Sequence, residues 1–513
     1  MKVRYINSLM LLFLLALGGC GETFLDVLPE DKITSAVFWT TENDVDLALN
    51  GVYAVLRETD MYSGTSVIFD SFTPDAHRWG SGIDNLIGRG EIHAGSGGFI
   101  TGRWTSCYKM ISRANYFLEN IERVESLSEE AKRRYRGEAH FLRGVAYALL
   151  AETYGRVPII TKVISVEEAR QLTQATVKET WQQAIADYDV AIQLLGKEAP
   201  QVGRATKGAA LGMKMRAYLY QNDYPNVLTV VDEIEALGLY SLFPSYEGLF
   251  LRENENNQEV LFDVQYIGGP IGQGATRMSY ILPGFHRATG AWAVPTDYLV
   301  EAYEMIDGSE VDPSNPFEGR DPRLGFTVTL PGTYIGPLLF NTEAIPHPSQ
   351  PIKHLAYRKY TDVLVDDRWP IEGQEDLNFI VIRYADVILA KAEALIETGL
   401  DISGGIELIN RIRTERNDVK MFTHPLSLTK EEARKALRHE RRIEFALEGI
   451  YRWADIKRWE IGPELYPLPI YGTNGALVET RYASGYQLPK DRYLPIPNQE
   501  LSMNPNLTQN PGW

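Results

Sequence analysis

The chain has very little cysteine: among its 513 residues only Cys20 and Cys107 carry a thiol. If Cys20 is used at the N-terminus, as argued below, the remaining thiol cannot form an intramolecular disulfide or a multi-cysteine metal site. Stability must then come from a packed core. The 44% of hydrophobic residues supply ample material for one, in two or three domains or in one large composite domain.

Positive charge and long apolar runs are also scarce. The 51 Lys and Arg residues are outnumbered by 68 Asp and Glu residues, which leaves a formal net charge of -17. Because nucleic acid binding depends on clustered cations that neutralise phosphates, this balance argues against a nucleic acid partner. The longest apolar run, residues 9–17, is about half the ~20 residues that a membrane-spanning helix needs, so no transmembrane anchor is expected.

Common catalytic and metal-binding motifs are absent. The sequence has no His-Glu-x-x-His zinc motif, no Gly-x-Ser-x-Gly nucleophile elbow and no phosphate-binding Gly-x-x-x-x-Gly-Lys-Ser/Thr loop. The glycine-rich residues 268–274 include Pro270, which removes an amide donor, so they predict a flexible loop. No calcium loop of the EF-hand type is present. We therefore expect no cofactor and no metal, although 68 acidic residues leave room for a glycosidase-like carboxylate pair.

The N-terminus has the order of a secretory signal peptide. Lys2 and Arg4 precede the apolar run, and Gly18 and Gly19 lead directly into Cys20. Residues 17–20 are similar to a bacterial lipobox, in which the cysteine is lipidated and becomes the new N-terminus. Several acyl chains would anchor the protein stably. The alternative is a secreted protein whose cysteine is incidental.

Apolar residues recur every three or four positions through most of residues 42–240 and predict a helical scaffold. The expected helices span residues 44–56, 108–121, 131–154, 181–195, 207–220 and 226–237. Residues 222–225 are a short breaker, so the last two helices should form an antiparallel hairpin. Such hairpins in series suggest repeats of the tetratricopeptide type, although no clean 34-residue period is visible.

The helical pattern returns after residue 380. A helix from Tyr384 should end at Gly399 and be followed by a partner over residues 402–413. Thr429 and Glu432 have capping-box spacing and predict the start of a further helix, which we expect to continue to Gly449.

This last helix would carry two stripes of like charge. At 3.6 residues per turn the stripes are Arg434, Arg438 and Arg442, and Glu440, Glu444 and Glu448. Like charges four positions apart destabilise an isolated helix, so each stripe should pair with another element. The carboxylates could be catalytic, but a salt-bridged brace at the end of the scaffold is the interpretation we favour, since all lie on one helix and no cleft is implied.

Two segments rich in Gly, Pro and aromatic residues interrupt the helices. They span residues 60–102 and 243–370, where short apolar runs at 259–264 and 326–330 predict strands among long loops. Binding sites usually lie on long loops supported by a rigid scaffold.

Both segments contain residues suited to sugars, which stack on Trp or Tyr rings while polar side chains bind the hydroxyls. The first segment supplies His77, Arg78, Trp79, Asp84 and Asn85, and the second Tyr280, His286, Arg287 and Trp292. We hypothesise that the two segments form one platform. The alternative is that each Trp anchors its own loop.

Several motifs are distinctive enough to indicate a family. They are Phe24-Leu25-Asp26-Val27-Leu28-Pro29, Ala48-Leu49-Asn50-Gly51-Val52-Tyr53, Arg136-Gly137-Glu138-Ala139-His140, Ile382-Arg383-Tyr384-Ala385-Asp386, and Leu494-Pro495-Ile496-Pro497. Over nearly its whole length the chain resembles the SusD/RagB family of outer-membrane nutrient-binding lipoproteins. That family has no invariant ligand motif, so the site residues above rest on composition and location alone.

The resemblance implies a mainly α fold in which about four tetratricopeptide-like hairpins support a loop-rich, short-strand ligand-binding half. The expected organisation is a signal peptide at 1–19, an N-terminal SusD-like helical region at 20–240 with a loop insertion at 60–102, and a C-terminal SusD/RagB region at 241–513. The last region would contain the irregular segment 243–370 and, within 380–460, a helical hairpin and the C-terminal helix.

The resemblance also implies a function without catalysis. A lipoprotein anchored at the outer membrane and exposed at the cell surface would bind a nutrient and deliver it to a SusC-like TonB-dependent barrel transporter, on which it acts as a lid. Aromatic platforms favour an oligosaccharide or polysaccharide over a peptide, which more often uses strand edges. A peptide-binding lid and a surface glycoside hydrolase remain the alternatives.

Overall fold

The computed structural model describes residues 38–64, 69–78, 80, 82–269, 274–275, 293–335, 338–339, 355–361, 373–471 and 476–513. The expected signal peptide and Cys20 lie outside these residues, as do five of the predicted ligand-binding residues, Trp79, Tyr280, His286, Arg287 and Trp292.

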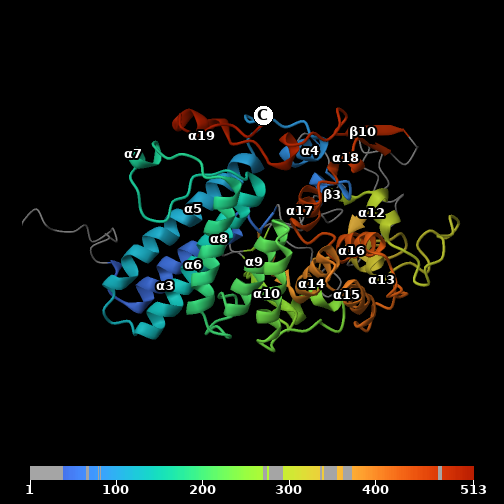
Figure 1. Ribbon diagram of the computed structural model, residues 1–513, viewed down its shortest axis with the longest axis horizontal. Coiled ribbons are helices and arrows are strands. Elements are labelled where there is room, and N and C mark those ends of the chain that lie inside the picture. The colour runs from blue at the N-terminus through green and yellow to red at the C-terminus, as the bar shows by residue number, and fades with distance from the viewer. Residues whose placement is uncertain are drawn as a thin grey trace, which may run out of the picture.

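The scaffold of the described residues is a row of paired helices (Figure 1). The pairs are α3 (Glu42–Tyr53) with α5 (Phe99–Asn120), α6 (Glu129–Thr153) with α8 (Val177–Leu194), α9 (Lys207–Tyr220) with α10 (Tyr224–Glu235), and α14 (Tyr384–Thr398) with α15 (Ile402–Thr414). Neighbouring pairs pack through α5 on α6, α8 on α9 and α10 on α14. This arrangement confirms the predicted mainly α fold with tetratricopeptide-like hairpins.

The ends of these helices follow from local sequence. The predicted capping box opens α16 (Lys430–Glu444), where the Thr429 amide donates to Glu432 Oε2 at 2.8 Å and the Glu432 amide donates to Thr429 Oγ1 at 3.4 Å. Gly399, with φ 73°, ends α14 in the left-handed conformation that favours glycine. None of the described helices has the length and apolar character to cross a bilayer.

Several predicted boundaries are wrong. The helix expected at 44–56 ends at Tyr53, and the one expected at 181–195 begins at Val177. The helix expected to continue to Gly449 ends at Glu444, because Leu447 and Gly449 adopt φ 65° and 86°, and α17 (Tyr451–Arg458) follows. The strand expected at 326–330 is shorter: its first two residues belong to α13 (Pro322–Thr327), and only β4 (Val328–Thr329) is a strand. Finally, α5 begins nine residues before the predicted start at 108. The prediction missed this start because glycine and polar residues in the first turns hide the apolar pattern that begins with the buried Phe99 and Ile100.

The strands that the structure describes form antiparallel pairs. The pairs are β1 (Ala76–Arg78) with β3 (Ala293–Pro295), β2 (Val260–Val264) with β8 (Phe379–Arg383), β4 with β7 (Ala356–Tyr357), β5 (Tyr334–Ile335) with β6 (Leu338–Leu339), and β9 (Leu468–Tyr471) with β10 (Leu477–Arg481). Short helices complete the description: α4 (Ile83–Arg89), α7 (Val166–Ala169), α12 (Asp297–Ala302), α18 (Gly462–Leu465) and α19 (Asn498–Met503), with 3-10 turns at Ala54–Arg57, Phe69–Phe72, Ile121–Arg123, Gly248–Phe250, Arg252–Asn254 and Lys490–Arg492.

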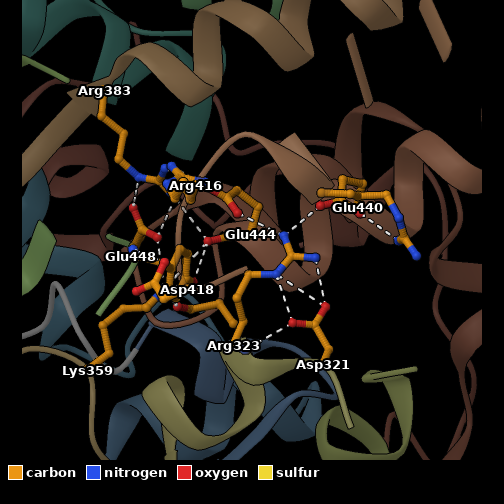
Figure 2. Close-up of polar contacts among 12 residues, drawn as sticks. Asp321, Arg323, Lys359, Arg383, Arg416, Asp418, Glu440, Glu444 and Glu448 are labelled. Atoms are coloured by element: carbon orange, nitrogen blue, oxygen red, sulfur yellow. Dashed lines mark hydrogen bonds and ion pairs between the residues drawn. The ribbon is translucent and has the colours of Figure 1, made fainter. Parts of the chain in front are cut away.

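The acidic stripe of α16 lies inside the protein and is fully paired (Figure 2). Glu440 contacts Arg323 at 2.5 Å and Arg413 at 3.0 Å. Glu444 contacts Arg323 at 2.9 Å, Arg383 at 2.7 Å and Arg416 at 3.0 Å. These partners come from α13, β8 and the α15 region, so the predicted brace is confirmed and extends over most of the C-terminal half.

The continuation of the stripe and the basic stripe are paired as well. Glu448 contacts Lys359 at 2.9 Å and Arg383 at 2.7 Å. Of the basic residues, Arg434 pairs with Glu397, Arg442 pairs with Asp75, and the Arg438 guanidinium lies over the Trp459 ring at 5.0 Å. Five of these six like charges are therefore compensated by opposite charges from other parts of the chain, and the sixth, Arg438, lies on an aromatic ring.

The central carboxylate is held in its charged form. Burial by itself would raise the pKa of Glu444, but Arg416, Arg383 and Arg323 outweigh that effect and hold the pKa well below its ordinary value. A carboxylate with a depressed pKa stabilises the fold above its unfolded pKa, and this stabilisation is lost as the pH falls through its folded pKa.

We predict that Glu444→Gln lowers the free energy of unfolding by about 3–5 kcal/mol at pH 7, because the amide leaves three buried guanidinium groups without their shared anion. Urea denaturation followed by circular dichroism measures the change. Glu415→Gln is the control, since Glu415 forms only an exposed pair with Arg411, and we expect it to cost less than about 1 kcal/mol. Equal losses in the two variants would contradict the bracing role.

Candidate ligand-binding site

The described ends of the two segments predicted to bind ligand lie next to each other. In the β1–β3 pair, Ala76 lies opposite Pro295, His77 opposite Val294 and Arg78 opposite Ala293. Arg78 immediately precedes Trp79 in the sequence, and Ala293 immediately follows Trp292. The register therefore brings the described ends of both segments together, which is the geometry that a shared platform requires.

The predicted polar residues of the first segment lie mostly beneath the surface. His77 is 2% exposed, with Nδ1 3.1 Å from Glu479 Oε1, and burial lowers the pKa of its imidazole. Arg78 pairs with Asp84, a buried carboxyl whose pKa is raised by burial. Asn85 donates from Nδ2 to the Gly80 carbonyl at 2.7 Å. Buried side chains bonded to the protein itself are suited to hold the loop in place, so we assign His77, Asp84 and Asn85 to positioning.

Glycine allows the helix next to this sheet to approach closely. In α4, a Cβ at Gly88 would collide with the carbonyl oxygen of Ser71, so only glycine fits there. Residues 69–72 form a buried 3-10 turn directly before β1. The glycine-rich composition of this segment predicted only loops, whereas here it serves close packing.

A hairpin that the sequence did not reveal forms the third part of the site. Ile470 of β9 packs against Val294 of β3, and Glu479 of β10 contacts His77. The buried Arg481 donates to the Thr73 and Ser71 carbonyls. Pro467 and Pro469 obscure β9 in the sequence, and residues 477–481, two apolar residues followed by three polar ones, lack the alternation that would have predicted β10.

The exposed face of this hairpin carries two apolar side chains. Tyr471 and Leu477 are register partners and are 54% and 58% exposed. Behind the hairpin, Tyr466, Tyr482 and Tyr486 pack with ring centroids 4.5, 5.2 and 5.9 Å apart. The hairpin thus has three packed tyrosines near the ends of its strands and one exposed tyrosine, Tyr471.

Charged groups fasten the base of the site to α16 and α17. Asp75 pairs with Arg442 at 2.5 Å and Arg452 at 3.3 Å, and its carbonyl accepts from the Thr296 amide at 3.0 Å. Asp70 Oδ2 accepts from the Leu447 amide at 2.6 Å. The segment before β1 and the residues after β3 are therefore both held on the braced helix.

Glu479 of β10 is likewise held by charged groups of the protein. Burial would raise the pKa of Glu479, but hydrogen bonds and charge from His77 and Arg481 lower it to about 2. Within the described part of the chain, no three His, Cys, Asp or Glu side chains gather as a metal site. The β1–β3 sheet and the β9–β10 hairpin therefore form a rigid base at the described ends of the two predicted segments.

Comparison with known proteins gives consistent matches over nearly the whole chain. Residues 258–513 match a family model described as SusD family, and residues 23–219 match one described as starch-binding associating with outer membrane. SusD-like protein P2 of Formosa agariphila is 25% identical over 531 residues, covering 98% of each chain. Starch-binding protein SusD of Bacteroides thetaiotaomicron is 23% identical over 79% of this chain and 76% of its own.

Solved structures show the same architecture. A SusD-like carbohydrate binding protein of Bacteroides fragilis has a TM-score of 0.80 at 27% identity, covering 92% of this chain and 100% of its own. A laminarin binding SusD-like protein has a TM-score of 0.72 at 23% identity, over 93% of this chain and 100% of its own.

The anchoring of the site predicts a pH effect at Asp70. Burial, with a contribution from Asp75, raises the pKa of Asp70 to about 7. Between about pH 4 and pH 7 the folded chain then retains a proton that the unfolded chain has lost, so this group makes stability fall as pH rises.

Asp70→Asn removes that titration while leaving an oxygen to accept from Leu447. We expect its free energy of unfolding, relative to the unchanged chain, to rise by about 2 kcal/mol from pH 5 to pH 7. Denaturant titrations at several pH values measure the difference, with Asp232→Asn on the surface as control. A difference that does not change with pH would refute the buried, protonated state of Asp70.

Proposed function

This chain belongs to the SusD family, and from that premise we propose that it binds a glycan at the cell surface, without catalysis, and delivers it to a transporter in the outer membrane. Two relatives support the ligand class by their descriptions, one as starch-binding and one as carbohydrate binding. The structural observation that carries the proposal is the β1–β3 register, because it joins two aromatic-rich segments on one rigid base.

In this proposal the contacts with ligand come from residues at and beyond the ends of the β1–β3 sheet. Trp79 and Trp292 would stack on the apolar faces of sugar rings, and Tyr280 would extend this surface. Arg78, His286 and Arg287 would bind hydroxyl groups. The buried His77, Asp84 and Asn85 would hold the first loop in place.

Location and partner follow from the family and the N-terminal sequence. We propose that Cys20 is lipidated and anchors the chain to the outer membrane, and that a SusC-like TonB-dependent barrel is the partner. A lid of this kind has to capture and then release its ligand. Micromolar affinity, about -8 kcal/mol, would permit both steps.

The first test is calorimetry of the soluble chain beginning after Cys20, titrated with a panel of glycans and mixed peptides. We expect saturable micromolar binding of a glycan that is recovered intact. Binding of peptides alone would make the chain a peptide-binding lid, and cleavage of a glycan would make it a surface hydrolase. Nanomolar binding would contradict a role in handover.

The second test addresses the platform. Trp79→Ala and Trp292→Ala should each weaken binding of the identified glycan by about tenfold, since each removes one stacking surface. Tyr116→Ala is the control, because Tyr116 is 42% exposed on α5 of the scaffold, and it should leave affinity unchanged. Unaltered affinity in both tryptophan variants would sink the shared platform.

A further inference from the structure

A cavity inside the protein, separate from the candidate glycan site, is a second notable feature. This cavity of about 40 Å³ separates the helical scaffold from the residues that follow α16. Most of its lining is apolar or aromatic, but it also includes charged and polar side chains: Arg103 of α5, Glu152 of α6, Arg216 and Tyr220 of α9, and Glu448. A volume of this size holds one small ion or about two water molecules.

Arg103 is the exceptional residue of this cavity. It is 1% exposed, and its guanidinium lies over the rings of Phe69 and Phe99, with 5.2 and 4.9 Å between Cζ and the ring centroids. Nε and Nη2 are buried and have no hydrogen-bond acceptor in the part of the chain that the structure describes. The ring faces attract the cation, but they leave these two donors without an acceptor.

The other fully buried arginines behave differently. Six of them pair with carboxylates: Arg323, Arg383, Arg413, Arg416, Arg441 and Arg481. Arg216, which lines the same cavity, contacts Asp386 at 3.0 Å. Among the described residues, Arg103 has no such ion pair. Because a guanidinium cannot lose its proton in a protein, this leaves one buried positive charge without an ion pair. An acidic group within its electrostatic influence is Asp60, whose pKa is raised by burial while the charge of Arg103 opposes that rise.

Tyr220, which lines the same cavity, carries a second donor without an acceptor in the described part of the chain. The hydroxyl of Tyr220 is buried and has no partner among the described residues. Two carboxylates also line the cavity, and both are paired: Glu152 with Lys457, and Glu448 with Lys359 and Arg383. Arg103 and Tyr220 therefore contribute buried N–H and O–H donors for which the described residues supply no acceptor, and Arg103 also carries a positive charge. A guanidinium with free donors favours an acceptor that carries negative charge.

The surroundings of the cavity also suit an anion. A smaller cavity of about 30 Å³ shares the lining residues Glu152, Trp181 and Tyr220. Its other lining residues include Lys457, Arg458 and Arg492. Each of these cations is paired, with Glu152, Glu393 and Glu460 respectively. The neighbouring cavity is therefore polar, but its cations, unlike Arg103, already have anionic partners.

We propose that the inner cavity is a binding site for a small monovalent anion of the size of chloride, held by the guanidinium of Arg103 and the hydroxyl of Tyr220. The bound anion would neutralise the buried charge. It would also link α5 and α9 to the residues after α16, and so stabilise the junction between the scaffold and the C-terminal half. The proposal is independent of the glycan site.

Crystals of the chain grown in sodium bromide test the site directly. We expect an anomalous peak within hydrogen-bond distance of Arg103. Arg103→Met keeps an apolar chain between Phe69 and Phe99 and should abolish the peak. Arg113→Met, an exposed change on the same helix, should retain it. Density explained by water alone, with no bromide, would overturn the proposal.

Thermal unfolding gives a second readout. Sodium chloride should raise the Tm of the chain by about 2 °C over sodium gluconate of equal ionic strength, since gluconate is too large for the cavity. The difference should vanish in Arg103→Met. If that variant does not fold, Tyr220→Phe, which removes only the hydroxyl, should require a several-fold higher chloride concentration for the same rise. Equal Tm values of the unchanged chain in the two salts would count against anion binding.

Discussion

The charge network around Glu444 is the interaction on which the C-terminal half of this protein depends. One carboxylate on α16 is shared by Arg323, Arg383 and Arg416, which belong to α13, β8 and the end of the α15 region. Arg383 and Arg416 also contact Glu259, the residue directly before β2. The network therefore joins the last helical hairpin to a small sheet and to the irregular segment. Because removing one partner of a buried ion pair leaves an uncompensated charge, the network keeps these parts in one arrangement.

The same helix also holds the base of the candidate site. Arg442 holds Asp75, and the turn that ends α16 offers the Leu447 amide to Asp70. Both aspartates lie just before β1, the strand that pairs with β3. Precise binding by loops requires a rigid support. Here the support is a chain of buried charges that runs from the scaffold through α16 to the points where the two aromatic segments emerge.

The buried charges also explain how an acidic protein uses its arginines. The chain has a formal net charge of -17, yet seven arginine side chains are fully buried. Planar guanidinium groups can bind two or more carboxylates at once, so a few buried arginines connect several elements. Arg103 lacks a carboxylate partner among the described residues, and this exception to the pattern is what points to an anion in the inner cavity.

Several features could be predicted from the sequence because they depend on nearby residues. The 3.6-residue periodicity predicted most scaffold helices, with α9 (Lys207–Tyr220) matching its predicted limits, and the capping box at Thr429 predicted the start of α16. The two stripes of like charge on α16 predicted a salt-bridged brace, since such stripes need partners. Composition likewise predicted which segments would carry the loops.

Contacts between residues far apart in the chain could not be predicted in this way. The Arg442–Asp75 pair joins residues 367 positions apart, and the His77–Glu479 contact joins residues 402 positions apart. No local pattern encodes such pairings. Consequently His77, Asp84 and Asn85 looked like sugar ligands, whereas their burial shows them to be bonded within the protein. By itself, the sequence determined the helical elements and the charge that they must neutralise. Only the tertiary structure decided which charges meet and which side chains are left for a ligand, because both depend on burial by distant parts of the chain.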